Sequence, residues 1–263
     1  MRISGQHVLV TGGSQGIGVE IAAEFVRRGA EVTVLGRNRD RLQAVAERLG
    51  SNYIQVDLAD SGAVLDAIDR VESLRRPVDI LINNAAVSLT CESGKYVAGD
   101  AQRVMMINAI APMELSRQVL PGMIERRRGH IVNVSSLAGV TAVPHLAVYG
   151  ASKAALHHYT AGVQRDLQLQ KVPVGMTLAT LGEVAGTQLM EDARASPVIA
   201  AVSEKLARTH AMPSIDAAQV ACAIARAVER DARYVSVPKR IGPVVQFRDV
   251  PSLLQDVLLR GVG

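Results

Sequence analysis

Cysteine, tryptophan and aromatic residues are scarce in this sequence of 263 residues. It contains two cysteines, Cys91 and Cys222, no tryptophan, and 3% aromatic residues. Two cysteines can form no disulfide framework and no four-thiolate metal site, and such sparse use is typical of a reducing compartment. We therefore predict a cytoplasmic protein that binds no metal.

Long hydrophobic runs and concentrated charge are also missing. No apolar stretch approaches the ~20 residues of a membrane-spanning helix, and the N-terminus shows no signal-peptide hydrophobic region. The formal net charge is +4, carried mostly by arginines spread along the chain, whereas nucleic-acid-binding proteins gather such charge on one face and add stacking aromatics. The densest basic run, Arg126–Arg128, is either a solvated helix end or a patch for a phosphate or a partner. We expect no nucleic-acid partner and no integral membrane span.

Hydrophobic residues make up 48% of the chain and charged residues 21%, as in an ordinary globular domain. Short β-branched runs alternate with longer helical patterns, and early runs such as Val8-Leu9-Val10 are continuously apolar, as in strands covered by helices on both faces. This predicts one α/β domain over residues 1–263, a Rossmann-type doubly wound sheet of about seven parallel strands flanked by helices. The predicted strands are His7–Thr11, Glu31–Leu35, Tyr53–Val56, Asp79–Asn83, His130–Val134, Val174–Leu178 and Tyr234–Val237. The predicted helices are Gly16–Arg28, Asp40–Leu49, Gly62–Leu74, Asp100–Arg126, Ala151–Gln170 and Ala217–Arg230.

Two segments depart from this alternation. Ala179–Pro213 is a long connection, and a connection of that length in a compact domain is usually functional, so we predict a mobile lid over a substrate site. The tail Ile241–Gly263 is rich in valine and leucine and predicts a short amphipathic helix. That helix either packs on its own domain or a neighbouring subunit, or contacts a lipid interface or closes over an apolar substrate.

A glycine-rich loop joins the first predicted strand to the first predicted helix, at Thr11–Gly18. Glycine permits positive φ in a tight turn and lets the backbone approach a pyrophosphate, and the helix N-terminus offers free N–H groups to the anion. The position of this loop, directly after a strand and before a helix, favours dinucleotide binding over a tight turn without a ligand.

Five motifs occur in order along the chain and together resemble the short-chain dehydrogenase/reductase family over essentially its whole length. They are the loop Thr-Gly-Gly-Ser-Gln-Gly-Ile-Gly at 11–18, Asn83-Asn84-Ala85-Ala86 (where the family has Asn-Asn-Ala-Gly), Asn108, Ser136, and Tyr149-Gly-Ala-Ser-Lys153. Ser136 lies thirteen residues before Tyr149, which is the family's usual spacing. The resemblance implies that the cofactor loop binds through Gly12, Ser14, Gln15, Gly16, Ile17 and Gly18, and that Asn84 and Ala85 complete this part of the site.

Tyr149 and Lys153 stand four residues apart on a predicted helix, so their side chains share one face. Carbonyl reduction needs a proton donor near neutral pH, and a nearby ammonium lowers the pKa of a phenol from about 10. The resemblance implies that Tyr149 is the acid/base, that Lys153 also binds the nicotinamide ribose, and that Ser136 holds the substrate oxygen. It further implies that Asn108 binds a water linking Lys153 to solvent. Ser135 is the alternative to Ser136, although strand alternation points the two to opposite faces.

The end of the second predicted strand bears on the choice between NAD and NADP. An acid there accepts from the ribose 2′-hydroxyl of NAD, whereas a basic residue pairs with the 2′-phosphate of NADP. The sequence has Gly36 where the acid would stand and Arg37 directly after it, followed by Asn38, and this resembles the NADP pattern. Gln15 departs from the Arg or Lys that many NADP-preferring members carry in the loop.

Two further groups of cofactor residues come from the resemblance. Asp57 resembles the acid that binds the adenine edge, with Leu58 supporting the base, although Asp57 is also a candidate helix cap. After the sixth strand the family has Pro-Gly-x-Val-x-Thr. Here Leu181 replaces the proline, and Thr187 is displaced by one residue. Gly182, Val184 and Thr187 are the matching candidates.

The resemblance thus implies an NADP(H)-dependent oxidoreductase that moves a hydride between nicotinamide and a ketone or secondary alcohol, with an apolar substrate expected from the Leu-, Val- and Met-rich lid and tail. One alternative is a 3-oxoacyl-thioester reductase acting on an acyl carrier protein or coenzyme A substrate; another is a sensor that binds NADPH without turnover. His145 is either a surface loop residue or a substrate contact. The resemblance also implies a homodimer or homotetramer packed through the helices at 100–126 and 151–170.

Overall fold

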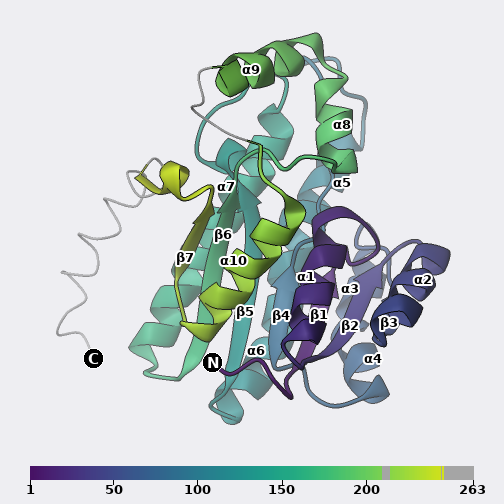
Figure 1. The fold of residues 1–263 in the computed structure, drawn as a ribbon, viewed down its shortest axis with the longest axis vertical. Coiled ribbons are helices and arrows are strands. Elements are labelled where there is room, and N and C mark those ends of the chain that lie inside the picture. The colour runs from purple at the N-terminus through teal and green to yellow at the C-terminus, as the bar shows by residue number, and fades with distance from the viewer. Residues whose placement is uncertain (209–213, 244, 246–263) are drawn as a thin grey trace.

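The computed structural model describes residues 1–208, 214–243 and 245 as one parallel α/β sandwich (Figure 1). Seven strands form a single sheet in the order β3-β2-β1-β4-β5-β6-β7, and every neighbouring pair is parallel. This confirms the predicted Rossmann-type sheet. The strands are β1 (His7–Thr11), β2 (Glu31–Gly36), β3 (Asn52–Gln55), β4 (Ile80–Asn83), β5 (Gly129–Ser136), β6 (Val174–Leu181) and β7 (Tyr234–Val237).

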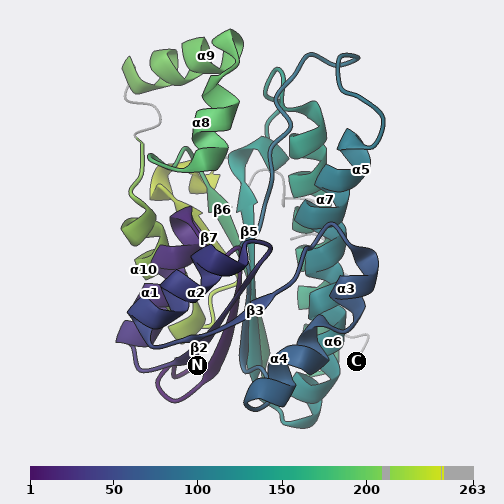
Figure 2. The ribbon, with the colours of Figure 1, turned by 90° about the vertical axis from the view of Figure 1, so that its right-hand side faces the viewer.

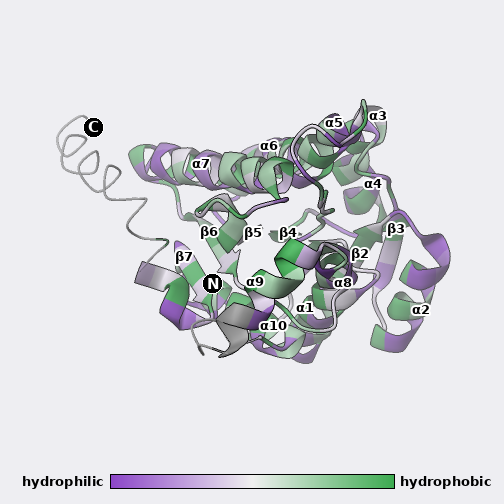
Figure 3. Cartoon of the chain, turned by 90° about the horizontal axis from the view of Figure 1, so that it is seen from above, coloured by the Kyte–Doolittle hydropathy of each residue, from purple (hydrophilic) through white to green (hydrophobic). Residues whose placement is uncertain are grey.

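Helices cover both faces of the sheet, as the views from the side and from above show (Figures 2 and 3). Because strand side chains alternate, Val8 and Val10 pack with α1, α2 and α10, whereas Leu9 packs on the opposite face with α4, α6 and α7. The helices are α1 (Gly16–Arg27), α2 (Arg39–Leu49), α3 (Ser61–Leu65), α4 (Ala67–Leu74), α5 (Asp100–Met105), α6 (Ala111–Glu125), α7 (Ala147–Leu169), α8 (Gln188–Arg194), α9 (Pro197–Arg208) and α10 (Ala217–Glu229).

Three predicted helices differ from those observed. The helix predicted at 62–74 is divided at Asp66, where α3 ends and α4 begins. The helix predicted at 100–126 contains a π-helical turn, Met106–Ile110, between α5 and α6. The helix predicted to start at Ala151 starts one turn earlier, at Ala147, so Tyr149 lies in its first turn.

The segment predicted as a long lid loop, 179–213, contains regular structure. Residues 179–181 are the buried end of β6, because β5 and β6 remain in register up to the pair Ser136 and Leu181. Helices α8 and α9 follow and lie above the carboxyl edge of the sheet (Figure 1). Residues 209–213 and most of the predicted tail helix lie outside the described residues.

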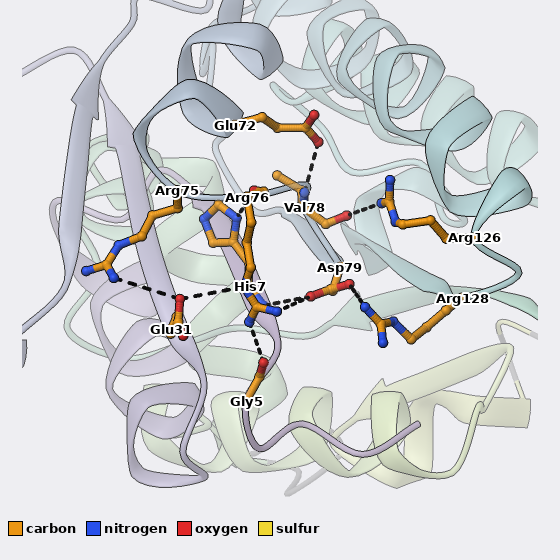
Figure 4. Close-up of polar contacts among 10 residues, drawn as sticks. All are labelled: Gly5, His7, Glu31, Glu72, Arg75, Arg76, Val78, Asp79, Arg126 and Arg128. Carbon is orange, nitrogen blue, oxygen red and sulfur yellow. Dashed lines mark hydrogen bonds and ion pairs between the residues drawn. The ribbon is translucent and has the colours of Figure 1, made fainter.

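A polar network covers the opposite, amino edge of the sheet (Figure 4). Its centre is the buried carboxylate of Asp79, which accepts from the backbone N–H of His7 at 3.0 Å and from the Arg128 guanidinium at 2.9 Å. Arg76 lies 3.6 Å from the same carboxylate. These bonds satisfy the buried charge where β1 and β4 begin.

The described residues contain no helix both long and apolar enough to cross a membrane.

Candidate active site

A cavity of about 790 Å³ opens at the carboxyl edge of the sheet. The strand order reverses between β1 and β4, and ligands of doubly wound folds bind in the crevice at that point. The cavity runs from the glycine loop to the lid helices α8 and α9. Most residues predicted for cofactor binding line it, namely Gly12, Ser14, Gln15, Gly16, Ile17, Gly18, Arg37, Asp57, Leu58, Asn84, Ala85, Gly182, Val184 and Thr187.

The glycine loop is shaped by close backbone approaches. A Cβ on Gly18 would lie 2.1 Å from the carbonyl oxygen of Gly12, and one on Gly12, whose φ is +67°, would lie 2.9 Å from Cα of Ala85. The Thr11 hydroxyl accepts from the backbone N–H groups of Asn84 and Ala85, at 3.0 and 3.1 Å. The loop is therefore tied to the end of β4. The first turn of α1 contains no acidic residue, so its free N–H groups suit an anion.

The adenosine side of the predicted site has a basic residue, a helix-capping asparagine and an aspartate. Arg37 follows β2 and lines the cavity, and its carbonyl accepts from the Gln55 side chain at 3.0 Å. Asn38 is the N-cap of α2, where it accepts from the N–H of Arg41, and it is not among the residues that line the cavity. Asp57 both lines the cavity and accepts from the N–H of Ala59 at 2.9 Å. The N-cap of α3 is Asp60, which accepts from the N–H groups of Gly62 and Ala63, so the helix-capping alternative for Asp57 is wrong.

Ser136, Tyr149 and Lys153 converge on the same cavity from β5 and α7. Burial raises the pKa of Tyr149 to about 12, and a hydrogen bond with Ser136 acts in the opposite direction. Burial lowers the pKa of Lys153 to about 8. The Lys153 Nζ atom donates to the carbonyl of Val134 at 3.0 Å and lies 5.8 Å from the centre of the Tyr149 ring. The phenol is therefore protonated near neutral pH in the protein alone.

The two candidate serines, adjacent at the end of β5, have different hydrogen-bond partners. Ser136 is half-buried and accepts from the N–H of Ala138 at 3.2 Å, and its hydroxyl faces Tyr149. Ser135 is buried and directs its hydroxyl to the carbonyl of Lys153 at 3.4 Å. Ser135 therefore contacts the backbone of α7, whereas Ser136 contacts the phenol of Tyr149.

Asn108 lies in the π-helical turn, fully buried behind the cavity. Its Oδ1 accepts from the N–H of Val87 at 2.9 Å, and its Nδ2 donates to the Val87 carbonyl at 2.8 Å and to the Ser152 hydroxyl at 3.0 Å. Ser152 in turn donates to the carbonyl of Tyr149 at 2.7 Å. The side chain thus links α7 to the loop after β4, and its expected contact with a relay water stays a prediction.

Residues 182–187 connect β6 to the first lid helix, α8. The N–H of Gly182 donates to the carbonyl of Val237 at 2.8 Å, and Val184 forms a parallel bridge with Ile215. Gly186 has a φ of +65°, a conformation that glycine adopts without strain. Thr187 is the N-cap of α8 and accepts from the N–H of Met190 at 3.4 Å.

The substrate end of the cavity contains residues that no sequence motif marked. The loop between β5 and α7 supplies Thr141, Val143, Pro144 and Leu146, and the lid supplies Leu189, Met190, Ala193, Ile199 and Val202. Their only sequence signal was the apolar character of the lid. Within residues 1–208, 214–243 and 245, no three His, Cys, Asp or Glu side chains gather as metal ligands.

A cavity at the switch point of a parallel sheet, with a glycine loop at one end and serine, tyrosine and lysine at the other, defines a dinucleotide-dependent oxidoreductase. A family model described as short chain dehydrogenase matches residues 6–197, and the chain belongs to this family.

Named relatives agree with that assignment. The NADP-dependent 3-hydroxy acid dehydrogenase YdfG of Salmonella typhi is 36% identical over 184 residues, which are 69% of this chain and 73% of that protein. The ketoacyl reductase HetN of Nostoc is 32% identical over 209 residues, 76% of this chain and 71% of that protein. A short-chain dehydrogenase from Sphingobium yanoikuyae in complex with NADPH has the same fold, with a TM-score of 0.79 at 22% identity, covering 96% of this chain and 95% of that one.

Proposed function

We propose that this oxidoreductase uses NADP(H) to interconvert an apolar ketone and its secondary alcohol, with Tyr149 as the general acid and base. The observation that supports this most directly is the convergence of Ser136, Tyr149 and Lys153 in one cavity with the glycine loop. The bound dinucleotide supplies the hydride in reduction and accepts it in oxidation.

The three side chains have distinct tasks in the proposed reduction. Ser136 donates a hydrogen bond to the carbonyl oxygen of the substrate and so holds it beside the phenol. Tyr149 donates its proton to that oxygen, which the raised pKa of about 12 permits near neutral pH. With a pKa of about 8, Lys153 is largely an ammonium at neutral pH. Its charge stabilises the phenolate that forms.

The preference for NADP(H) is inferred from the charge at the end of β2. Arg37 lines the cavity directly after Gly36, where an acid would favour NAD. A guanidinium can bind a phosphate through two parallel hydrogen bonds, whereas a carboxylate would repel it. The relative YdfG is named as NADP-dependent, which agrees with this inference.

An apolar substrate is inferred from the residues around the far end of the cavity. Val143, Leu189, Met190 and Val202 line it. Glu183 also lines it, but its carboxylate pairs with Arg194. In the part of the chain that the structure describes, no unpaired cation is positioned there for a substrate carboxylate. The names of YdfG and HetN favour a second candidate, a 3-hydroxyacyl or 3-oxoacyl substrate.

Titration with NADPH and with NADH tests the cofactor assignment, with quenching of nicotinamide fluorescence as the readout. We expect NADPH to bind at least about tenfold more tightly and Arg37→Ala to abolish that preference, a loss of roughly 1.4 kcal/mol or more. Arg103→Ala, which removes an exposed arginine on α5, is the matched control and should leave the preference intact. Equal binding of both cofactors by the wild type would refute the assignment.

A substrate panel separates the candidate activities. Turnover of simple apolar ketones supports the main proposal, whereas turnover restricted to acyl thioesters supports the second candidate. Tight NADPH binding without any carbonyl reduction would indicate a sensor.

We also propose a homodimer or homotetramer, packed through α5, α6 and α7, in the cytoplasm. Two large hydrophobic residues are exposed on this side, Ile110 at the end of the π-helical turn between α5 and α6 and Leu169 on α7, and both cysteines are unpaired. Light scattering after size exclusion tests the assembly, and cell fractionation tests the location.

A further inference from the structure

His145 lies beside the cavity in an unusual backbone conformation. It stands in the loop between β5 and α7, one turn before Tyr149, and its φ is +64°. This left-handed conformation is uncommon for a residue other than glycine and is kept only where surrounding contacts hold it. One such contact is a backbone hydrogen bond, in which the N–H of Cys91 donates to the His145 carbonyl at 3.0 Å.

The imidazole of His145 reaches across to the lid. Its Nδ1 lies 2.8 Å from the hydroxyl oxygen of Ser196, in the short connection between α8 and α9, and either group can donate. Figure 2 shows the lid helices on one side of the carboxyl edge and α7 on the other. The hydrogen bond therefore joins two segments that are distant in sequence and that face each other across the cavity.

Both partners are flanked by residues that line the substrate end. Pro144 and Leu146 on either side of His145 line the cavity, as do Ala193 and Ile199 on either side of Ser196. His145 itself lies behind this lining. The His145–Ser196 hydrogen bond thus connects two walls of the cavity, and neither residue belongs to the glycine loop.

We infer that His145 is a positioning residue that holds the lid closed on the substrate through Ser196. This inference rests on the proposed function, because it assigns the walls of the same cavity. Loss of the His145–Ser196 hydrogen bond should weaken ketone binding and so raise KM. It should leave NADPH binding and kcat nearly unchanged.

Three substitutions of His145 separate the side-chain bond from the backbone conformation. His145→Asn keeps a hydrogen-bonding group near the position of Nδ1 and tolerates the left-handed conformation. His145→Gly accepts that conformation but lacks the bond, and His145→Ala has neither property. We expect the KM for a ketone to rise about 2- to 10-fold in His145→Gly, the range of one neutral hydrogen bond, and at least as much in His145→Ala. His145→Asn should stay within about 2-fold of the wild type.

Ser196→Ala tests the partner. It should raise KM as much as His145→Gly, and the double variant should be no worse than either single variant, because both remove the same bond. His158→Asn, an exposed histidine further along α7, is the control and should change nothing. Additive losses, or a loss in kcat with KM unchanged, would overturn the inference.

Hydrogen exchange of ligand-free protein gives a readout that needs no turnover. Amides in α8 and the start of α9 should exchange faster in His145→Gly and Ser196→Ala than in the wild type or His145→Asn, with the sheet unaffected. If exchange in the lid follows this pattern but no ketone is reduced, the role of the His145–Ser196 hydrogen bond in holding the lid is supported and the proposed function fails. If ketones are reduced but neither KM nor exchange in the lid changes in these variants, the positioning role of His145 is refuted and the proposed function stands.

Discussion

Replacement of Lys153 by methionine should change how the stability of the ligand-free protein depends on pH. Lys153 is 2% exposed, and its ammonium donates to the carbonyl of Val134. Burial lowers its pKa from 10.5 to about 8. Between these two values the unfolded chain binds more protons than the folded protein, so the free energy of unfolding rises with pH. Below pH 7 both states carry the proton, and this contribution no longer changes.

The size of the effect follows from the two pKa values of Lys153. Between pH 7 and pH 9.5 the linkage relation gives a gain in the free energy of unfolding of about 2 kcal/mol for the wild type relative to a variant that lacks the amine. Tyr149 acts in the opposite sense, because its pKa is raised to about 12. Its contribution falls mostly above pH 10 and is nearly constant over this range.

Urea unfolding at pH 7, 8 and 9.5 measures this difference between wild type and Lys153→Met. Other titrating groups are common to both proteins and cancel. Lys95→Met removes an exposed lysine that pairs with Glu92 on the surface, and its pH dependence should match the wild type. Parallel curves for wild type and Lys153→Met would show that the ammonium is as well solvated in the folded protein as in the unfolded chain, and the electrostatic description of the site would then be wrong.

Three further predictions concern the site and its support. Tyr149→Phe should lower ketone turnover by at least about 100-fold while NADPH binding stays within about 2-fold, because the variant loses only the proton donor; steady-state kinetics with a ketone that the wild type reduces would reveal any surviving activity. Gly18→Ala places a Cβ 2.1 Å from the Gly12 carbonyl oxygen and should abolish dinucleotide binding in the fluorescence titration, whereas Gly162→Ala, with open space on α7, should bind normally. Asp79→Ala removes the acceptor of the buried His7 N–H and should lower the free energy of unfolding in urea by about 2–3 kcal/mol. Asp79→Asn should lower it less, because its amide oxygen can still accept that hydrogen bond. Equal losses in the two variants would contradict this role of the Asp79 carboxylate.

The sheet could be predicted from the sequence because its central strands are continuous apolar runs. The runs around Leu9 and Leu81 mark strands buried on both faces, and the structure confirms them. The carboxyl ends of β5 and β6 were missed, since Ser135, Ser136 and Thr180 interrupt the apolar pattern there. Backbone pairing continues through these polar residues, and their side chains form hydrogen bonds with α7 or with the turn that follows β5.

The helices around the site were less predictable. A π-helical turn inserts one residue without changing composition, so the periodicity of 100–126 gave no sign of the break at Met106–Ile110. The lid was predicted as a long connection because the segment 179–213 contains both glycine and proline residues. Thr187 caps α8, but a threonine that caps a helix and one that binds a nicotinamide are indistinguishable in sequence.

The role of Asn108 depends on geometry that no motif contains. Its side chain forms hydrogen bonds with the backbone of Val87 and with the hydroxyl of Ser152, so its amide connects the loop after β4 to α7. Ser152 extends this connection, because its hydroxyl donates to the backbone carbonyl of Tyr149 in the preceding turn of α7. A serine between the tyrosine and the lysine of the motif therefore carries part of the site's rigidity. Asn108 lies within the π-helical turn, so an irregularity that the sequence gave no sign of contains the residue that connects the loop after β4 to the helix of Tyr149.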